Sequence, residues 1–205
     1  NGIIGARRDT GFDDEIYYRS GGIRLHYRTL TGASEGIKEG ILLEAGFDRV
    51  TPNNAMTISS WAYDKAIRQG VPVIDNRALD IACYHPGYTF VEKLQTVATK
   101  FRQEQETKQE RQNLMRQYYD IYSLLGNDEV RKFIGTEEYF EHKEERFPKV
   151  DLHIPIAENE AFLLSNQELK DRFVQRYQAT ATLYYNGQPD FEEMLAEIGR
   201  WVEKL

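Results

Sequence analysis

Cysteine is almost absent from this chain of 205 residues, and its single copy, Cys83, excludes an internal disulfide. One unpaired cysteine also fits the reducing environment of the cytoplasm. No apolar run approaches the ~20 residues that span a membrane, and no secretory signal pattern opens the chain, so we expect no membrane association. Lys and Arg number 26 against 33 for Asp and Glu, which gives a net charge of −7. Nucleic acid would therefore have to bind at a local basic patch, and we expect no sequence-specific DNA binding.

The motifs of several common enzyme classes are missing as well. The four histidines are scattered and share no metal-ligand spacing, which argues against a zinc site. The chain holds no GxGxxG, no P-loop and no GxSxG. The pair Ser59-Ser60 has no convincing set of His and Asp partners, which argues against a serine hydrolase.

The first half of the chain carries strand patterns. Residues 22–30 alternate between apolar and basic side chains, which predicts a half-buried strand with a solvated basic face. Residues 37–47 hold the run Ile-Leu-Leu followed by Glu44, which predicts a central strand that ends in a carboxylate. Because a short loop joins the two segments, antiparallel pairing is expected.

Two amphipathic helices are predicted back to back in residues 88–125, the stretch around which the chain is organised. Their apolar residues recur at helical spacing: Phe90, Leu94, Val97 and Phe101 in the first helix, and Leu114, Tyr118, Ile121 and Leu125 in the second. Thr89 is predicted as the N-cap of the first helix. The polar link at 103–111 predicts an exposed turn or frayed helix ends.

The order of the remaining patterns indicates the fold class. They predict strands at 71–75 and 78–85, a short helix at 128–134, a solvated, turn-rich segment at 135–166, and helices from 167 and from 191. Strands come first and helices follow, so the predicted class is α+β, with a small mixed or antiparallel sheet and a C-terminal helical bundle. We divide the chain into a β-rich part, 1–87, and a helical part, 88–205.

Each of the two central helices carries one ionisable residue in an apolar neighbourhood. Lys93 follows Phe-Val-Glu, and its flexible ammonium suits it to hold a triphosphate. Asp120 lies between pairs of apolar and aromatic residues and suits the orientation of a lysine or a link to a metal. The structural alternatives are a lysine at the edge of the core and an ion pair of Asp120 with Lys93 or with Arg116, four residues earlier.

Glu44 has two interpretations of the same kind. A carboxylate at the end of a strand can supply an oxygen ligand to Mg²⁺. The alternative is a glutamate that leaves the sheet for solvent, as charged residues at strand ends usually do. The tyrosines at 118, 119 and 122 are interpreted as core and boundary residues, with base stacking as the less favoured role.

Three segments in order carry a family resemblance: ILLEAGF, PGYTFVEKL and RQYYDIYSLL. Together they resemble the AbiEii/AbiGii group of nucleotidyltransferase toxins, within the polymerase-β-like nucleotidyltransferase superfamily. The resemblance runs from about Gly22 to Leu125. It implies a small sheet with helices followed by a helical domain, and transfer of a nucleotidyl group from an NTP with Mg²⁺, in several members to tRNA 3′ ends. It also implies a toxin of a phage-defence system with a cognate antitoxin as partner.

The resemblance assigns roles residue by residue. Glu44 corresponds to the third carboxylate of the family and is expected to bind the metal. Lys93 corresponds to the motif lysine and Asp120 to the last conserved acid, so all three are expected to be catalytic. We expect Lys93 and Arg116 to contact the nucleotide.

One family motif has no counterpart in the chain. The family carries Gly-Gly followed by Arg-x-Ser-x-Asp-x-Asp, whereas Gly21-Gly22 is followed by IRLHYRTL, and Asp13-Asp14 precedes the pair. We expect the motif to lie upstream of Asn1 and the chain to be catalytically incomplete without it. The alternative from another class is a non-catalytic relative that binds a protein or RNA.

Overall fold

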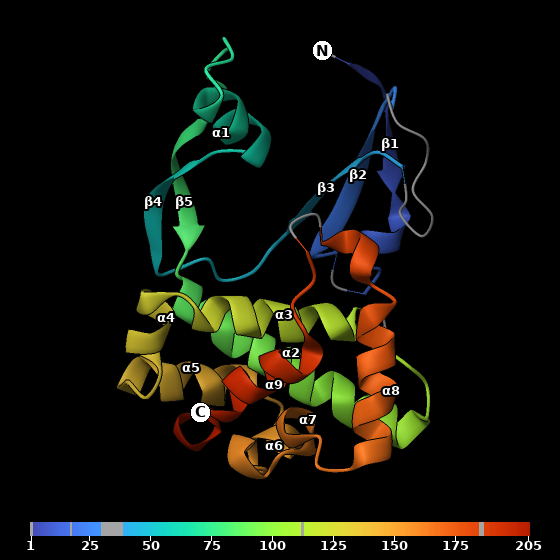
Figure 1. Ribbon diagram of the computed structural model, residues 1–205, viewed down its shortest axis with the longest axis vertical. Helices are drawn as coiled ribbons and strands as arrows, with labels where there is room; N and C mark the ends of the chain where they lie inside the picture. Colours follow the sequence, from blue (N-terminus) through green and yellow to red (C-terminus); the bar gives the residue numbers. More distant parts are fainter. Residues whose placement is uncertain (1, 17, 30–38, 112, 185–186) are drawn as a thin grey trace. The chain divides into compact units, whose positions relative to one another are not determined.

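The computed structural model of the protein describes residues 2–16, 18–29, 39–111, 113–184 and 187–205 (Figure 1). The chain forms two compact units, Asn1–Thr51 and Pro52–Leu205, and each is described by itself. Antiparallel strands come first and helices follow, which confirms the predicted α+β class. The functional division at residue 87 stays a prediction.

The first unit is built on a three-stranded antiparallel sheet in the order β1-β2-β3. Its elements are β1 (Ile3–Asp9), η1 (Thr10–Phe12), β2 (Ser20–Tyr27) and β3 (Ile41–Gly46). The predicted antiparallel pairing is confirmed. The prediction of a central strand at 37–47 is wrong, because β3 lies at one edge of the described sheet and β2 lies at its centre. The apolar run misled because it predicts burial, whereas Ile41 and Leu43 are about half exposed, at 50% and 54%.

The predicted faces of β2 are also reversed at their centre. Ile23 is 50% exposed, while the Arg24 side chain is only 14% exposed. The cause is a cross-strand ion pair, in which Arg24 Nε donates to Asp9 Oδ2 at 2.8 Å. This pair covers Arg24, one of the basic residues that alternation alone assigned to water.

The second unit begins with a two-stranded antiparallel sheet and a helix between its strands. These elements are β4 (Asn53–Ile58), α1 (Trp61–Arg68) and β5 (Ala78–Tyr84). Ser60 caps α1 by accepting a hydrogen bond from the Tyr63 N–H. The strand predicted at 71–75 is wrong, because this segment has no regular structure.

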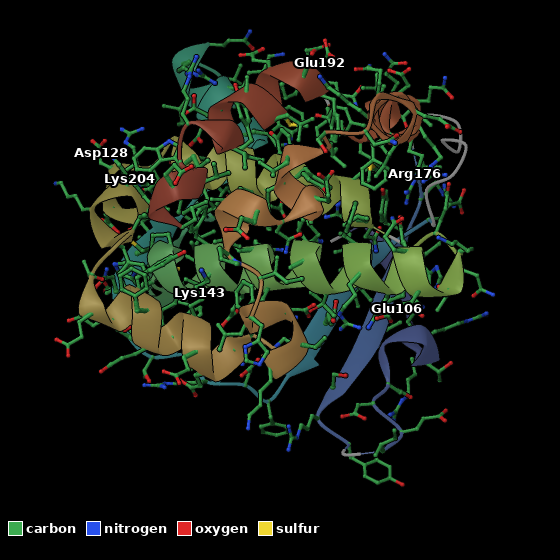
Figure 2. The ribbon with its side chains drawn as sticks, turned by 90° about the horizontal axis from the view of Figure 1, so that it is seen from below. Glu106, Asp128, Lys143, Arg176, Glu192 and Lys204 are labelled. Atoms are coloured by element: carbon green, nitrogen blue, oxygen red, sulfur yellow. The ribbon has the colours of Figure 1, made fainter. Side chains whose placement is uncertain are left out.

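Helices make up the rest of the second unit. They are α2 (Pro86–Thr107), α3 (Leu114–Leu125), α4 (Asp128–Phe133), α5 (Glu137–Arg146), α6 (Lys149–Leu152), η2 (Ile156–Glu158), α7 (Glu160–Leu163), α8 (Gln167–Gln178), η3 (Ala181–Leu183), α9 (Phe191–Gly199) and η4 (Val202–Lys204). The central helix is α2, which contacts α3, α4, α5, α6 and α7 (Figure 2). Within the described residues the buried apolar core lies entirely between Phe90 and Leu205, and it includes all eight apolar positions predicted for α2 and α3. None of the described helices is long and apolar enough to cross a membrane.

The start of α2 differs from its prediction. His85, not Thr89, is the N-cap, and its Nδ1 accepts a hydrogen bond from the Gly87 N–H at 3.1 Å. Pro86 is the first helical residue, a position where the fixed φ of proline is already helical and its missing N–H costs no hydrogen bond. The dipeptide Pro86-Gly87 therefore begins the first turn of α2 shortly after the end of β5.

The segment 135–166, predicted as turns, contains α5, α6 and α7 instead. Thr136 caps α5 by accepting from the Tyr139 N–H at 3.2 Å. Acidic residues occupy the first turn of α5 and basic residues its last turn. These charges stabilise the helix because they interact favourably with its dipole. Tyr139 and His142 are buried on its inner side, so one buried stripe holds a helix whose sequence is otherwise charged.

Candidate functional site

Lys93 and Asp120 meet between the two central helices of the second unit. Lys93 is on α2 beside the fully buried Leu94, and Asp120 is on α3 beside the fully buried Ile121. The Lys93 Nζ lies 2.9 Å from Asp120 Oδ2, and the two side chains are 29% and 31% exposed. The apolar stripes of α2 and α3 thus bring this pair together at the rim of the core, within reach of solvent.

A third polar side chain completes the contacts of the lysine. Lys93 Nζ donates to Gln117 Oε1 at 3.0 Å. Gln117 is three residues before Asp120 on α3, so both face α2 from the same side of their helix. The two partners account for two of the three N–H donors of an ammonium, which leaves one donor without an acceptor among the described residues.

Two further cations lie near this pair along the same helices. Lys100 is seven residues after Lys93 on α2, two turns or about 10.5 Å along the axis. Burial lowers the pKa of Lys100 from its ordinary value, and the positive charge of Lys93 lowers it further. Arg116, one turn before Asp120 on α3, is exposed. Asp120 is paired with Lys93, as one of the two structural alternatives for Asp120 predicted.

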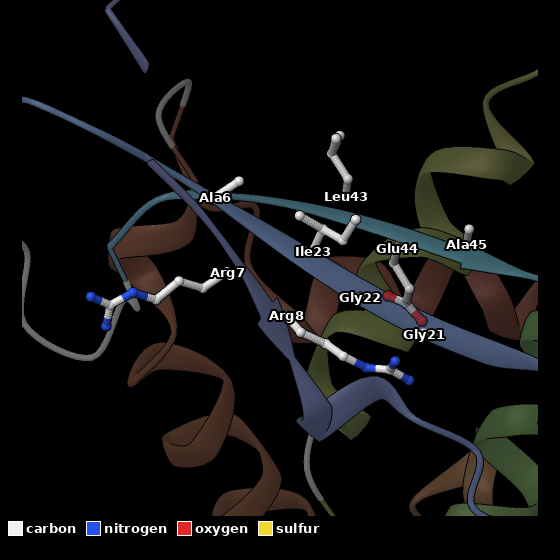
Figure 3. A pocket seen from close by; sticks show the side chains of 9 residues that line it. All are labelled: Ala6, Arg7, Arg8, Gly21, Gly22, Ile23, Leu43, Glu44 and Ala45. Carbon is white, nitrogen blue, oxygen red and sulfur yellow. The ribbon is translucent and has the colours of Figure 1, made fainter. Parts of the chain in front are cut away.

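Glu44 belongs to the first unit. It does not end its strand, because β3 continues to Gly46, and it lies opposite Gly22 of β2. Figure 3 shows the side chains of Ile23 and Leu43 on one side of these strands and the Glu44 carboxylate turned to the other side. The prediction of a strand-end carboxylate is therefore wrong in position.

A groove of about 570 Å³ runs over this part of the first sheet (Figure 3). Small residues and two half-exposed apolar side chains form most of its lining: Ala6, Gly21, Gly22, Ile23, Leu43 and Ala45. Arg7, Arg8 and Glu44 contribute the charged groups. Arg8 is held by Asp13, with 3.1 Å between its Nη2 and Asp13 Oδ2, so part of this charge is neutralised within the unit.

Comparison with protein-family models matches residues 1–197 to a family described as nucleotidyl transferase AbiEii toxin, type IV TA (toxin–antitoxin) system. The chain belongs to the AbiEii family. Searches of curated proteins and of solved structures found no match. The AbiEii match is wider than the resemblance predicted from about Gly22 to Leu125, because it includes β1 and almost the whole helical region. Membership identifies the chain with nucleotidyltransferase toxins of type IV systems.

Nucleotidyl transfer ordinarily uses Mg²⁺, which takes oxygen ligands. The described residues contain no group of three or more His, Cys, Asp or Glu side chains that could hold a metal ion. Glu44 faces Gly22 across the strand pair, which offers no second side-chain ligand. Asp120 is already neutralised by Lys93. The described side chains therefore do not by themselves complete a magnesium site.

Of the predicted site residues, the structure brings Lys93 and Asp120 together and places Arg116 on the same helix as Asp120. Glu44 lies in the other unit. Gln117 and Lys100 were not predicted from the sequence. Their helical spacing from Asp120 and Lys93 is the signal that would have found them, since residues three, four and seven apart share a helix face.

Proposed function

We propose that this AbiEii-family protein transfers a nucleotidyl group from an NTP, and that Lys93 binds the triphosphate. One observation supports this assignment most directly. The Lys93 ammonium is held by Asp120 and Gln117 at the solvent-accessible rim of the core, with a donor to spare. A lysine in such a position can donate to phosphate oxygens while it keeps its contacts with Asp120 and Gln117.

The proposed reaction needs a cation where negative charge develops. An acceptor oxygen bonds to the α-phosphorus, the bond from this phosphorus to the bridging oxygen breaks, and pyrophosphate leaves with the electron pair. The acceptor proton passes to solvent. Because charge builds up on the leaving pyrophosphate, Lys93 beside it stabilises the transition state. Asp120 and Gln117 fix the direction of the ammonium, and the exposed Arg116 supplies a second cation for the phosphates.

The finer assignments follow from the family resemblance. We propose Glu44 as one carboxylate ligand of Mg²⁺, which when bound neutralises the phosphates, although the described residues do not complete its site. We propose a tRNA 3′ end as acceptor, a cognate antitoxin as partner and the cytoplasm as location. The lone Cys83 supports only the last of these.

The test is a transfer assay with the full-length protein, each of the four labelled NTPs, Mg²⁺ and total tRNA. Lys93→Ala is expected to lower the transfer rate by at least about 100-fold, the lower end of the range for loss of one charge-stabilising group. Lys170→Ala is the matched control, because Lys170 also pairs with a carboxylate at 2.9 Å, Glu192, at nearly the same lysine exposure.

Three results would count against the proposal. Equal loss in the two lysine variants would mean that charge or stability, not the site, governs the rate. Full activity of Lys93→Ala would remove the lysine from the mechanism. Absence of transfer by the unaltered full-length protein, with every NTP, would favour the non-catalytic alternative, a module that binds protein or RNA.

A further inference from the structure

The three tyrosines in the motif region of α3 have different surroundings. Tyr118 is fully buried, and its hydroxyl donates to the Ala161 carbonyl at 2.6 Å, so it belongs to the core. Tyr122 donates to Glu193 at 3.2 Å, toward α9. Tyr119 is only partly buried and packs against Tyr184, with ring centroids 4.7 Å apart and planes inclined by 62°. Only Tyr119 thus belongs to an aromatic pair that is partly open and adjacent in sequence to Asp120.

Tyr184 lies close to the charged groups of the site, although it is far from them in sequence. It follows η3, and its ring meets Tyr119 on α3. Burial raises the pKa of its hydroxyl, while the charge of Arg116 lowers this pKa and that of Asp120 raises it. Both charges act on the Tyr184 hydroxyl, so the aromatic pair lies near Arg116 and Asp120.

We propose that Tyr119 and Tyr184 form a platform on which the base of the bound nucleotide stacks while Lys93 holds its triphosphate. This inference rests on the proposed nucleotidyl transfer. A nucleotide has an anionic end and a flat aromatic end, and the two ends need different partners. Lys93 and Arg116 suit the phosphates, and two partly open tyrosine rings suit the base.

The platform has a consequence for specificity. Every base offers a π face, so stacking tolerates any base. Tyr119 and Tyr184 therefore contribute affinity for all four NTPs, and their loss is expected to weaken all four. They should contribute nothing to the binding of inorganic tripolyphosphate, which has no base.

The experiment measures binding directly, by isothermal titration calorimetry with ATP, with UTP and with inorganic tripolyphosphate, on the full-length protein. Tyr184→Leu is expected to weaken both nucleotides about tenfold and to leave tripolyphosphate binding unchanged. Tyr184→Phe keeps the ring and should restore nucleotide binding. Lys93→Gln should weaken all three ligands. Tyr122→Leu removes a ring elsewhere on α3 and serves as the control, with no change expected for any ligand.

The outcomes separate this inference from the proposed function. Unchanged nucleotide binding by Tyr184→Leu, or equal weakening of nucleotides and tripolyphosphate, overturns the platform. Failure of Tyr184→Phe to restore binding overturns stacking as its cause. If nucleotides bind with the expected pattern while no transfer occurs, the platform stands and the transferase proposal fails. Absence of nucleotide binding by the unaltered protein overturns both.

Discussion

Two ion pairs of the helical unit are expected to respond very differently to neutralisation. Lys93 and Asp120 are each about one-third exposed, so water and the remaining partners can solvate whichever charge is left. Glu104 is 7% exposed and accepts two hydrogen bonds from Arg176 (labelled in Figure 2), each at 2.8 Å, and one from the Arg111 N–H at 2.6 Å. We propose that the first pair serves the transfer reaction, whereas the burial of the second pair suits it to stability.

The magnitudes follow from burial. Asp120→Asn is expected to cost about 0.2–1 kcal/mol of unfolding free energy, the range for solvent-accessible pairs. Glu104→Gln leaves the nearly buried Arg176 guanidinium with its longer 3.4 Å contact to the exposed Glu110 and without its bidentate partner, which is expected to cost about 3–5 kcal/mol. Against a total of roughly 5–15 kcal/mol, the second change removes a large fraction of the stability and the first does not.

The assay is equilibrium urea unfolding followed by far-UV circular dichroism, with transfer activity measured on the same preparations. Asp120→Asn is expected to lose activity and keep nearly all of its stability. Glu104→Gln is expected to lose stability but to keep its activity at urea concentrations below its unfolding midpoint. A stability loss for Asp120→Asn as large as that for Glu104→Gln would refute this reasoning, because the Lys93–Asp120 pair would then be a structural element. Lys93→Met, which keeps the aliphatic stem, tests the same expectation from the other side of the pair.

Two further predictions concern stability. Burial lowers the pKa of His142 from its ordinary value of 6.5, although the charge of Glu92 opposes this shift. The unfolded chain therefore binds the proton more tightly than the folded chain does, and the free energy of unfolding falls as the pH drops below 6.5. His142→Gln should therefore reduce the fall in the urea midpoint between pH 7.5 and 5.5, and parallel falls would contradict the assignment. In Gly87→Ala the new Cβ would lie 2.4 Å from Phe133 Cδ1. Overpacking of about 1–3 kcal/mol should exceed the ~1 kcal/mol gained in helix propensity, so the melting temperature should fall, and a rise would show that the ring moves aside.

The elements that could be predicted from the sequence are the helices with a continuous buried apolar stripe. Apolar residues at helical spacing located α2 and α3 because each is buried along a continuous stripe. The error at 135–166 has a local cause: the charged residues of α5 mask a helix that depends on the Thr136 cap and two buried side chains. Alternation failed in β2 because the Arg24–Asp9 pair, which reverses its faces, joins two strands that the sequence does not relate.

The candidate site divides in the same way. Lys93 and Asp120 were predicted because each interrupts an apolar helix, and the pairing of α2 with α3 brings them together. Tyr184 was beyond prediction, since it comes from a segment after α8 whose only link to the site is a tertiary ring contact with Tyr119. Glu44 was assigned through a family resemblance, and its place in an exposed edge strand could not be read from a run of apolar residues.

The buried residues that stabilise α2 and α3 also orient the side chains of Lys93 and Asp120. Phe90 and Leu94 are fully buried on α2, which fixes the rotation of this helix and hence the direction of Lys93. Tyr118 and Ile121 fix α3 and Asp120 in the same way. A shift of one residue in either register turns a helix by about 100° and would separate the ammonium from its carboxylate. Because helices hold side chains more precisely than loops do, a volume-conserving core change such as Leu94→Met should lower activity before it unfolds the protein.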